Sequence, residues 1–241
     1  MLSYKSLLVF NKRLVFILLT LTASFNGECT VNVDKSRVIF SSGELTANIS
    51  LHNSHKEPIL VQLWTDAGDP LTTPDKVKTP VLVNPPVLKM QPNEVRNIRL
   101  LLVSTEDLPQ NKESIFWLNI LQIPPNTNQV SKEKNKLILP LRIRLKVFVR
   151  PKSVGDITSD DFDKILFSKV NSNTVIIKNP TKWYITIPSL RIADIKSKPI
   201  WLGPFSHISL HVKNEINEKE SVTFDVIDDV GAIHRRVSVI N

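Results

Sequence analysis

The segment from residue 137 to residue 150, LILPLRIRLKVFVR, carries the clearest alternation of apolar and polar positions in the chain. Every odd position is aliphatic, and most even positions are Arg or Lys. Successive side chains of a β-strand point to opposite faces, so this pattern predicts one long strand with an aliphatic face and a basic face. Such a strand is either a core strand with a solvated basic face or a strand that pairs with another chain.

Shorter runs of the same kind fill the rest of the chain, separated by polar and proline-containing turns. They predict strands at 37–40, 46–52, 59–65, 81–83, 87–90, 95–103 and 114–123, and in the second half at 174–178, 183–192, 208–212, 222–227 and 233–240. No window shows the periodicity of an amphipathic helix. The predicted fold class is therefore all-β, with two sandwich domains.

The N-terminus has the pattern of a secretory signal peptide. Lys5, Lys12 and Arg13 precede an apolar run at 14–23, which is too short to span a bilayer. We expect a signal peptide at 1–27, with cleavage between residues 23 and 29, and no stable membrane insertion after its removal.

Two domains are predicted to follow the signal peptide, at 28–151 and 152–241. The polar stretch 152–163, which contains Gly155, is the predicted link between them.

Composition narrows the function further. The formal net charge of +8 falls to +5 without residues 1–27, which is too modest to indicate nucleic acid as a partner. Cys29 is the single cysteine, so the chain has no intramolecular disulfide.

Sequence signatures of enzymes are missing. We find no nucleophile elbow, zincin motif or phosphate loop, so we expect neither enzyme activity nor a cofactor. His207 and His211 would share one face of a strand, but nothing supplies further metal ligands, so no metal site is expected. The acidic pairs at 160–161 and 228–229 are predicted to be solvated turn residues.

Five motifs, in order, resemble the periplasmic chaperones of bacterial pilus assembly by the chaperone–usher route. They are SRVIF at 36–40, LPQNKESIFWLN at 108–119 followed by IPP at 123–125, IRLKVFVRP at 143–151, NPT at 179–181 and DDVGA at 228–232. The resemblance implies two immunoglobulin-like β-sandwich domains set at an angle, with a cleft between them. The short 126–136 loop, which has no cysteine pair, resembles the short-loop branch of the family.

The resemblance also implies roles for individual residues. Arg37 and Lys146 would hold the C-terminal carboxylate of a pilin subunit. The donor strand would present an alternating row to an incomplete subunit, namely Leu137, Leu139, Leu141, Ile143 and Leu145. An interdomain ionic triad would comprise Glu113, Arg150 and Asp229, with Asp229 favoured over Asp228. Pro140 departs from the pattern, because it removes one backbone N–H from the donor strand.

The resemblance implies a periplasmic, non-enzymatic chaperone. It would bind, fold and cap pilin subunits by donor-strand complementation and deliver them to an outer-membrane usher. Strand donation between chaperone and pilin is an established form of β-augmentation. The alternative is a structural β-sandwich subunit or adhesin, which would be expected to have one domain and an N-terminal donor extension.

Overall fold

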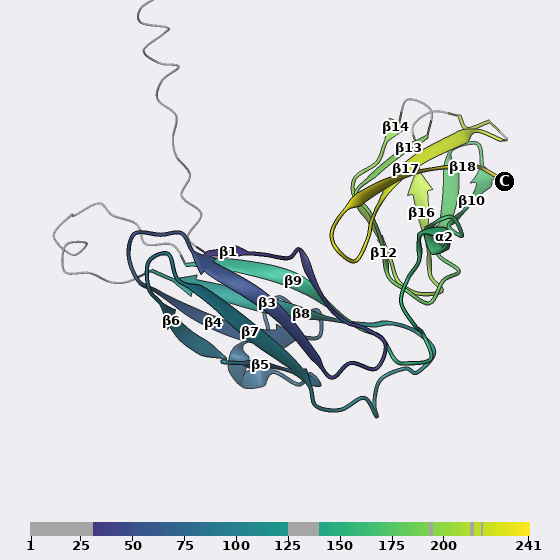
Figure 1. Cartoon of the computed structure of the whole chain (residues 1–241). Helices are drawn as coiled ribbons and strands as arrows, with labels where there is room; N and C mark the ends of the chain where they lie inside the picture. Colours follow the sequence, from purple (N-terminus) through teal and green to yellow (C-terminus); the bar gives the residue numbers. More distant parts are fainter. Residues whose placement is uncertain (1–30, 125–139, 193–194, 213–214, 218) are drawn as a thin grey trace, which may run out of the picture.

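The fold was analysed in a computed structural model, which describes residues 31–124, 140–192, 195–212, 215–217 and 219–241. Two separate clusters of buried hydrophobic side chains lie in it, one in each half of the chain. Figure 1 shows the two corresponding domains set at an angle, with the chain crossing between them at one end. The predicted signal peptide, Cys29 and the 126–136 loop lie outside the described residues.

The first domain is a β-sandwich. Its strands are β1 (Val31–Val33), β2 (Arg37–Phe40), β3 (Thr46–Asn53), β4 (Ile59–Asp66), β5 (Val81–Asn84), β6 (Val87–Met90), β7 (Val95–Leu102), β8 (Ser114–Ile123) and β9 (Leu141–Val149), with a short 3-10 helix, η1 (Pro74–Lys76). One sheet has the order β1-β3-β7-β5, and the other has the order β2-β9-β8-β4-β6. The inward-facing side chains of both sheets form the core, as alternation requires.

Strand prediction was accurate in this domain except at two places. β1 was missed, because three residues are too few to show alternation. The long strand predicted from residue 137 is seen as β9, which starts at Leu141, directly after Pro140. Pro140 is described and exposed, and it precedes the strand, so its missing N–H removes no hydrogen bond from the part of the ladder that the structure describes.

The second domain consists of shorter strands. They are β10 (Leu166–Asn171), β11 (Thr174–Lys178), β12 (Ile185–Ile187), β13 (Ser189–Ile192), β14 (Ile195–Lys196), β15 (Ile200–Leu202), β16 (His207–His211), β17 (Ser221–Ile227) and β18 (Ile233–Val239). They form sheets of order β14-β13-β17-β18 and β10-β11-β16, and a pair β12-β15. Pro188 separates β12 from β13, which the sequence predicted as one strand.

Part of the predicted polar link, 152–163, is helical. Residues Ser159–Phe162 form α2, a single turn that begins with a capping box between Thr158 and Asp161. Asp161 was predicted to be a solvated turn residue, but it is buried and also pairs with Lys164 at 2.7 Å. The prediction was wrong because a one-turn helix carries no periodic signal, and because its carboxylate is needed to satisfy the first backbone donors.

In the described ranges, no helix has the length and apolar character needed to cross a membrane.

Candidate functional site

Two cations from separate segments meet at the boundary between the domains. Arg37 is the first residue of β2, and the parallel pairing of β2 with β9 places it directly opposite Lys146. Residues that face each other across a ladder point to the same side of the sheet. The two cations, called here the cation pair, therefore lie side by side although 108 residues separate them in the sequence.

The Lys146 ammonium is surrounded by groups from both domains. Its Nζ donates to Thr186 Oγ1 at 3.3 Å. It also lies 5.9 Å from the ring centroid of Trp117 in β8 and 5.1 Å from that of Trp201 in β15. Burial, with a smaller contribution from the Arg37 charge, lowers the pKa of Lys146 from 10.5 to about 8.

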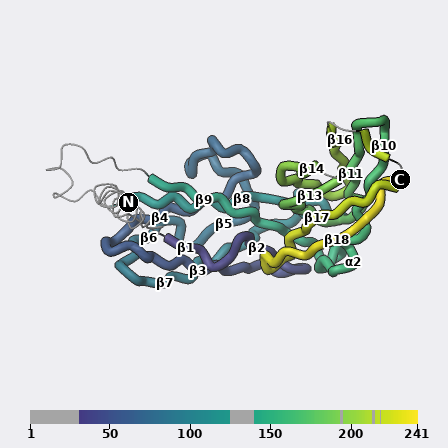
Figure 2. Tube along the Cα trace, turned by 90° about the horizontal axis from the view of Figure 1, so that it is seen from above, coloured from purple at the N-terminus to yellow at the C-terminus, as the bar shows by residue number. Residues whose placement is uncertain are grey.

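Arg37 is also partly withdrawn from water, and burial lowers its pKa despite the opposing charge of Asp229. Its Nη1 donates to the carbonyl of Ile227 at 3.5 Å, whereas its Nε is buried without a hydrogen-bond acceptor in the described structure. Arg37 lines a pocket between the domains with a volume of about 320 Å³, to which Asp229 and Val230 of the second domain also contribute. Figure 2 shows the β17–β18 hairpin next to β2 at this point.

The cation pair has no ion-paired carboxylate, in contrast to Arg144, the neighbouring cation of β9. Arg144 pairs with both carboxylate oxygens of Asp66, at 2.7 and 2.9 Å, and Arg142 donates to the carbonyl of Pro70. Neither Arg37 nor Lys146 forms an ion pair with any residue in the part of the chain that the structure describes. Two adjacent, partly desolvated cations that form no ion pair favour an external carboxylate or similar anion.

One edge of β9 is open next to the cation pair. β8 pairs with β9 from Leu141 to Val149, but β2 covers the other edge only from Lys146 to Val149. Among the described strands, none pairs with 141–145 on that second side. Backbone donors and acceptors therefore remain available there, immediately before the cation pair.

The predicted donor residues differ in exposure. Leu137 and Leu139 lie outside the described residues. Leu141 is 46% exposed, Ile143 packs partly against the core of the first domain, and Leu145 is 8% exposed within that core. The side chain of Leu145 is therefore committed to its own domain, and among these three it is Leu141 that leaves a large apolar surface uncovered.

The three residues of the predicted ionic triad lie in direct contact. Arg150 Nε donates to Glu113 Oε1 at 2.7 Å, and its two terminal nitrogens reach Asp229 at 2.5 and 2.7 Å. Arg150 and Glu113 are buried, and Asp229 comes from the second domain. Glu113 also accepts a hydrogen bond from the backbone N–H of Tyr184, which adds a second link between the domains.

Burial outweighs charge pairing at Glu113, whereas charge pairing outweighs burial at Arg150. It raises the pKa of Glu113 to about 7, against the charge of Arg150 and the hydrogen bond from Tyr184. Burial alone would lower the pKa of Arg150, but the hydrogen bonds and charges of Asp229 and Glu113 together raise it. Arg150 is therefore held charged, and removing it would leave a buried carboxyl without its partner.

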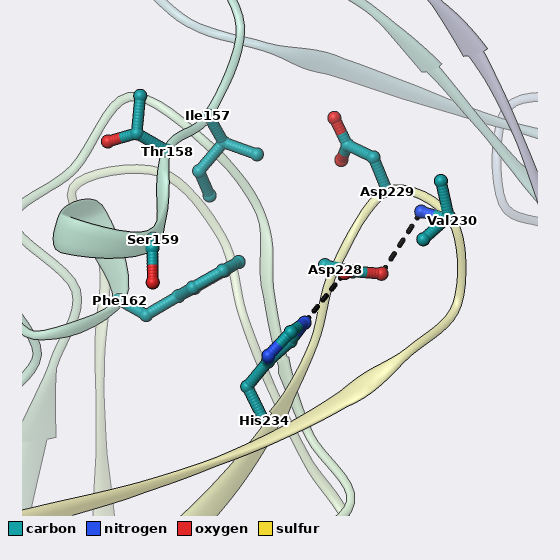
Figure 3. Close-up of a pocket in the computed structure, with 8 residues that line it drawn as sticks. All are labelled: Ile157, Thr158, Ser159, Phe162, Asp228, Asp229, Val230 and His234. Atoms are coloured by element: carbon teal, nitrogen blue, oxygen red, sulfur yellow. Dashed lines mark hydrogen bonds and ion pairs between the residues drawn. The ribbon is translucent and has the colours of Figure 1, made fainter.

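Asp228, the aspartate not chosen for the triad, stabilises the β17–β18 turn. Its side chain accepts from the backbone N–H groups of Val230 and Ala232 and contacts His234 Nε2 at 2.7 Å. Figure 3 shows the carboxylates of Asp228 and Asp229 pointing in different directions. The pocket drawn there, of about 260 Å³, lies against α2 in the second domain. The interpretation of residues 228–229 as a solvated turn pair therefore missed the role of Asp228, whereas the family resemblance had already implied the contact of Asp229 with Arg150.

The turn also approaches the first domain closely. Gly231 has a φ of +89°, and a Cβ added to it would lie 2.8 Å from Ser36 Oγ. Only glycine combines that backbone conformation with this contact.

Sequence reasoning did not identify the second-domain residues around Lys146, namely Thr186, Trp201 and Tyr184. Thr186 and Trp201 face each other in the β12–β15 pair, and Tyr184 stacks on Trp201 with ring centroids 5.3 Å apart. In the sequence, Tyr184 and Thr186 lie in the strand predicted at 183–192 and Trp201 lies in a short apolar run, and neither pattern indicates an approach to Lys146. No group of three or more potential metal ligands occurs among the described His, Cys, Asp and Glu side chains.

Two family matches cover most of the chain. Residues 30–155 match the family described as "Pili and flagellar-assembly chaperone, PapD N-terminal domain", and residues 160–238 match "Pili assembly chaperone PapD, C-terminal domain". The chain is thus a two-domain, immunoglobulin-like chaperone of pilus assembly, and it belongs to the PapD family.

Individual relatives agree with this assignment. The chain is 31% identical over 198 residues to "Probable fimbrial chaperone YehC" of Escherichia coli (strain K12), covering 81% of each protein. It is 28% identical over 232 residues to "Chaperone protein HifB" of Haemophilus influenzae, covering 95% of this chain and 94% of that protein. These relatives are named chaperones, so the alternative of a structural fimbrial subunit or adhesin is not favoured.

Solved structures share the fold. The chain is similar to the crystal structure of the Pseudomonas aeruginosa CupB2 chaperone, with 26% identity, a TM-score of 0.71 and coverage of 87% of this chain and 100% of that one. It is also similar to a chain of the complex between the Salmonella enterica SafA pilin and the SafB chaperone, with 25% identity, a TM-score of 0.73 and coverage of 89% and 98%. The predicted fold class and family resemblance are confirmed.

Proposed function

We propose that this chaperone binds pilin subunits by lending them the open edge of β9, and that the cation pair holds the subunit's C-terminal carboxylate. The observation that carries the proposal is the position of two unpaired cations at the point where the open edge ends. A strand running parallel to β9 along residues 141–145 would continue the line of β2 and end next to Arg37 and Lys146. The complex of the SafA pilin with the SafB chaperone, a similar protein, supports a pilin as the partner.

The cation pair would fix the register of the bound strand. A shift by one residue would turn every side chain of that strand to the other face. A carboxylate anchored at the cation pair prevents such a shift, because charge-assisted hydrogen bonds form in one position only. Leu141 would contribute its exposed side chain to the subunit, together with Leu137 and Leu139, whereas Ile143 and Leu145 would contribute mainly their backbone groups.

The triad of Glu113, Arg150 and Asp229 would hold the interdomain angle that completes the site. Each cation of the pair contacts the other domain: Lys146 donates to Thr186, and Arg37 to the carbonyl of Ile227. A change in the angle between the domains would therefore alter both cation environments.

We further propose that residues 1–27 are a signal peptide, that domains 28–151 and 152–241 follow, and that the protein works in the periplasm and delivers subunits to an outer-membrane usher. Its action is non-enzymatic and uses no cofactor, since binding and strand pairing are sufficient for the task. The family assignment and the apolar run at 14–23 support these proposals.

Alanine substitutions in the cation pair test this function. Co-expression of a pilin subunit with Arg37→Ala or Lys146→Ala should reduce the subunit recovered with the chaperone to background, because each change removes one anchor of the carboxylate. Lys89→Ala is the matched control, since Lys89 is an exposed cation of β6, the edge strand farthest from β2 in the same sheet. Normal subunit recovery with both cleft variants, at unchanged chaperone stability, would overturn the proposal.

A further inference from the structure

Trp201 is a large apolar residue that stays 43% exposed next to the cation pair, which calls for an explanation. It belongs to the second domain, whereas Lys146 belongs to the first. The 5.1 Å between the Lys146 ammonium and the Trp201 ring centroid is within the range of a cation–π interaction. Trp117 of the first domain lies at 5.9 Å, so one indole from each domain flanks the ammonium.

The orientation of Trp201 is fixed by its neighbours. Tyr184 stacks on it with an interplanar angle of 12°, and Tyr184 in turn contacts the ring of Phe148. The backbone of Trp201 is held by β12, where Thr186 is its direct partner.

A lysine side chain that must capture an anion gains from such fixation. Its four-carbon stem is flexible, and ordering it on binding costs side-chain entropy. A flanking indole lowers that cost by favouring one position of the ammonium before the anion arrives. Thr186 adds a hydrogen bond at 3.3 Å, also from the second domain.

We propose that Trp201 is a positioning residue for carboxylate capture: its indole holds the Lys146 ammonium in place, so that the second domain takes a direct part in anchoring the subunit's chain end. This inference rests on the proposed function and extends it. The π-face, not apolar bulk, performs the role. The contribution of the carboxylate to binding should therefore be largest with Trp at position 201, smaller with Phe, and smallest with Leu or Ala.

The experiment compares two probes on the full-length mature chaperone. The probes are a fluorescent peptide of alternating Val and Thr that ends in a free carboxylate, and the same peptide with a C-terminal amide. Fluorescence anisotropy gives the affinity ratio of acid over amide, which isolates the contribution of the carboxylate. The wild-type protein should bind the acid probe clearly more tightly than the amide probe. The acid-over-amide ratio should be about fivefold to tenfold smaller than the wild-type ratio in Trp201→Leu and Trp201→Ala, and intermediate in Trp201→Phe.

Controls separate positioning from folding. Phe205→Leu removes another exposed aromatic of the second domain and should leave the ratio unchanged, since among the described residues the rings in cation–π contact with Lys146 are those of Trp117 and Trp201. Affinity for the amide probe should be unaffected in every variant. A wild-type ratio that persists in Trp201→Leu overturns the role of Trp201 alone. Equal binding of both probes by wild type, or binding of neither, overturns the carboxylate anchor itself.

Discussion

Carboxylate capture should weaken as the pH rises above about 8, because Lys146 must be charged to bind an anion. Burial lowers the pKa of Lys146 to about 8 in the free protein, from an ordinary value of 10.5. A bound carboxylate favours the ammonium and raises that pKa again. Between the free and bound values, binding takes up a proton, so affinity falls by at most about tenfold per pH unit.

The size of the effect follows from the difference between the pKa of Lys146 in the free protein, about 8, and its ordinary value of 10.5. Full restoration of the pKa would give a fall of about 30-fold between pH 7 and pH 9.5, but Lys146 is partly exposed, and solvent screening reduces this to about tenfold. Arg37 remains charged throughout, so binding should weaken without vanishing. The assay is the acid-over-amide affinity ratio, measured by anisotropy at fixed ionic strength across this pH range.

A lysine-to-arginine change provides the matched control. Lys146→Arg keeps a positive charge at every pH in the range, so its ratio should stay flat from pH 7 to pH 9.5. The affinity of the amide probe should not follow the same profile in either protein. A flat wild-type ratio, or an equal fall in Lys146→Arg, would refute the reasoning that desolvation of Lys146 tunes anion capture.

Three further predictions concern stability, measured by urea denaturation. Because burial lowers the pKa of Lys146, its charge destabilises the free protein below about pH 8, and this cost disappears towards pH 10.5. Lys146→Met should therefore raise the free energy of unfolding by about 1–2 kcal/mol at pH 7, and the gain should shrink at higher pH. Leu145→Ala should cost about 2–4 kcal/mol, and Leu141→Ala less than about 1 kcal/mol while weakening subunit binding; equal costs would contradict the burial difference. Arg150→Ala should cost about 3–5 kcal/mol, because it leaves the buried carboxyl of Glu113 without its partner. Asp229→Ala, at the exposed end of the triad, should cost about 1–2 kcal/mol, and the reverse order of costs would argue against this geometry.

The sequence alone determined the fold class and most strands of the first domain. Alternation is a local property of the chain, and it survives wherever a strand has one buried face, as in β3 and β7. The five motifs, in their order, also pointed to the family from the sequence alone, because each lies in a strand or turn whose local geometry constrains its residues. Very short elements such as β1, β15 and α2 escaped prediction because they contain too few residues for a period to show.

Only the tertiary structure decided which side chains are free to act. The alternation at residues 137–149 makes Leu141 and Leu145 equivalent, yet one is half exposed and the other is buried in the core. The basic row of β9 likewise contains three similar cations, of which Arg144 is neutralised by Asp66, 78 residues away. Lys146 alone in that row faces Thr186 and Trp201 of the other domain. Burial and charge compensation depend on contacts between distant segments, and a local pattern carries no information about them.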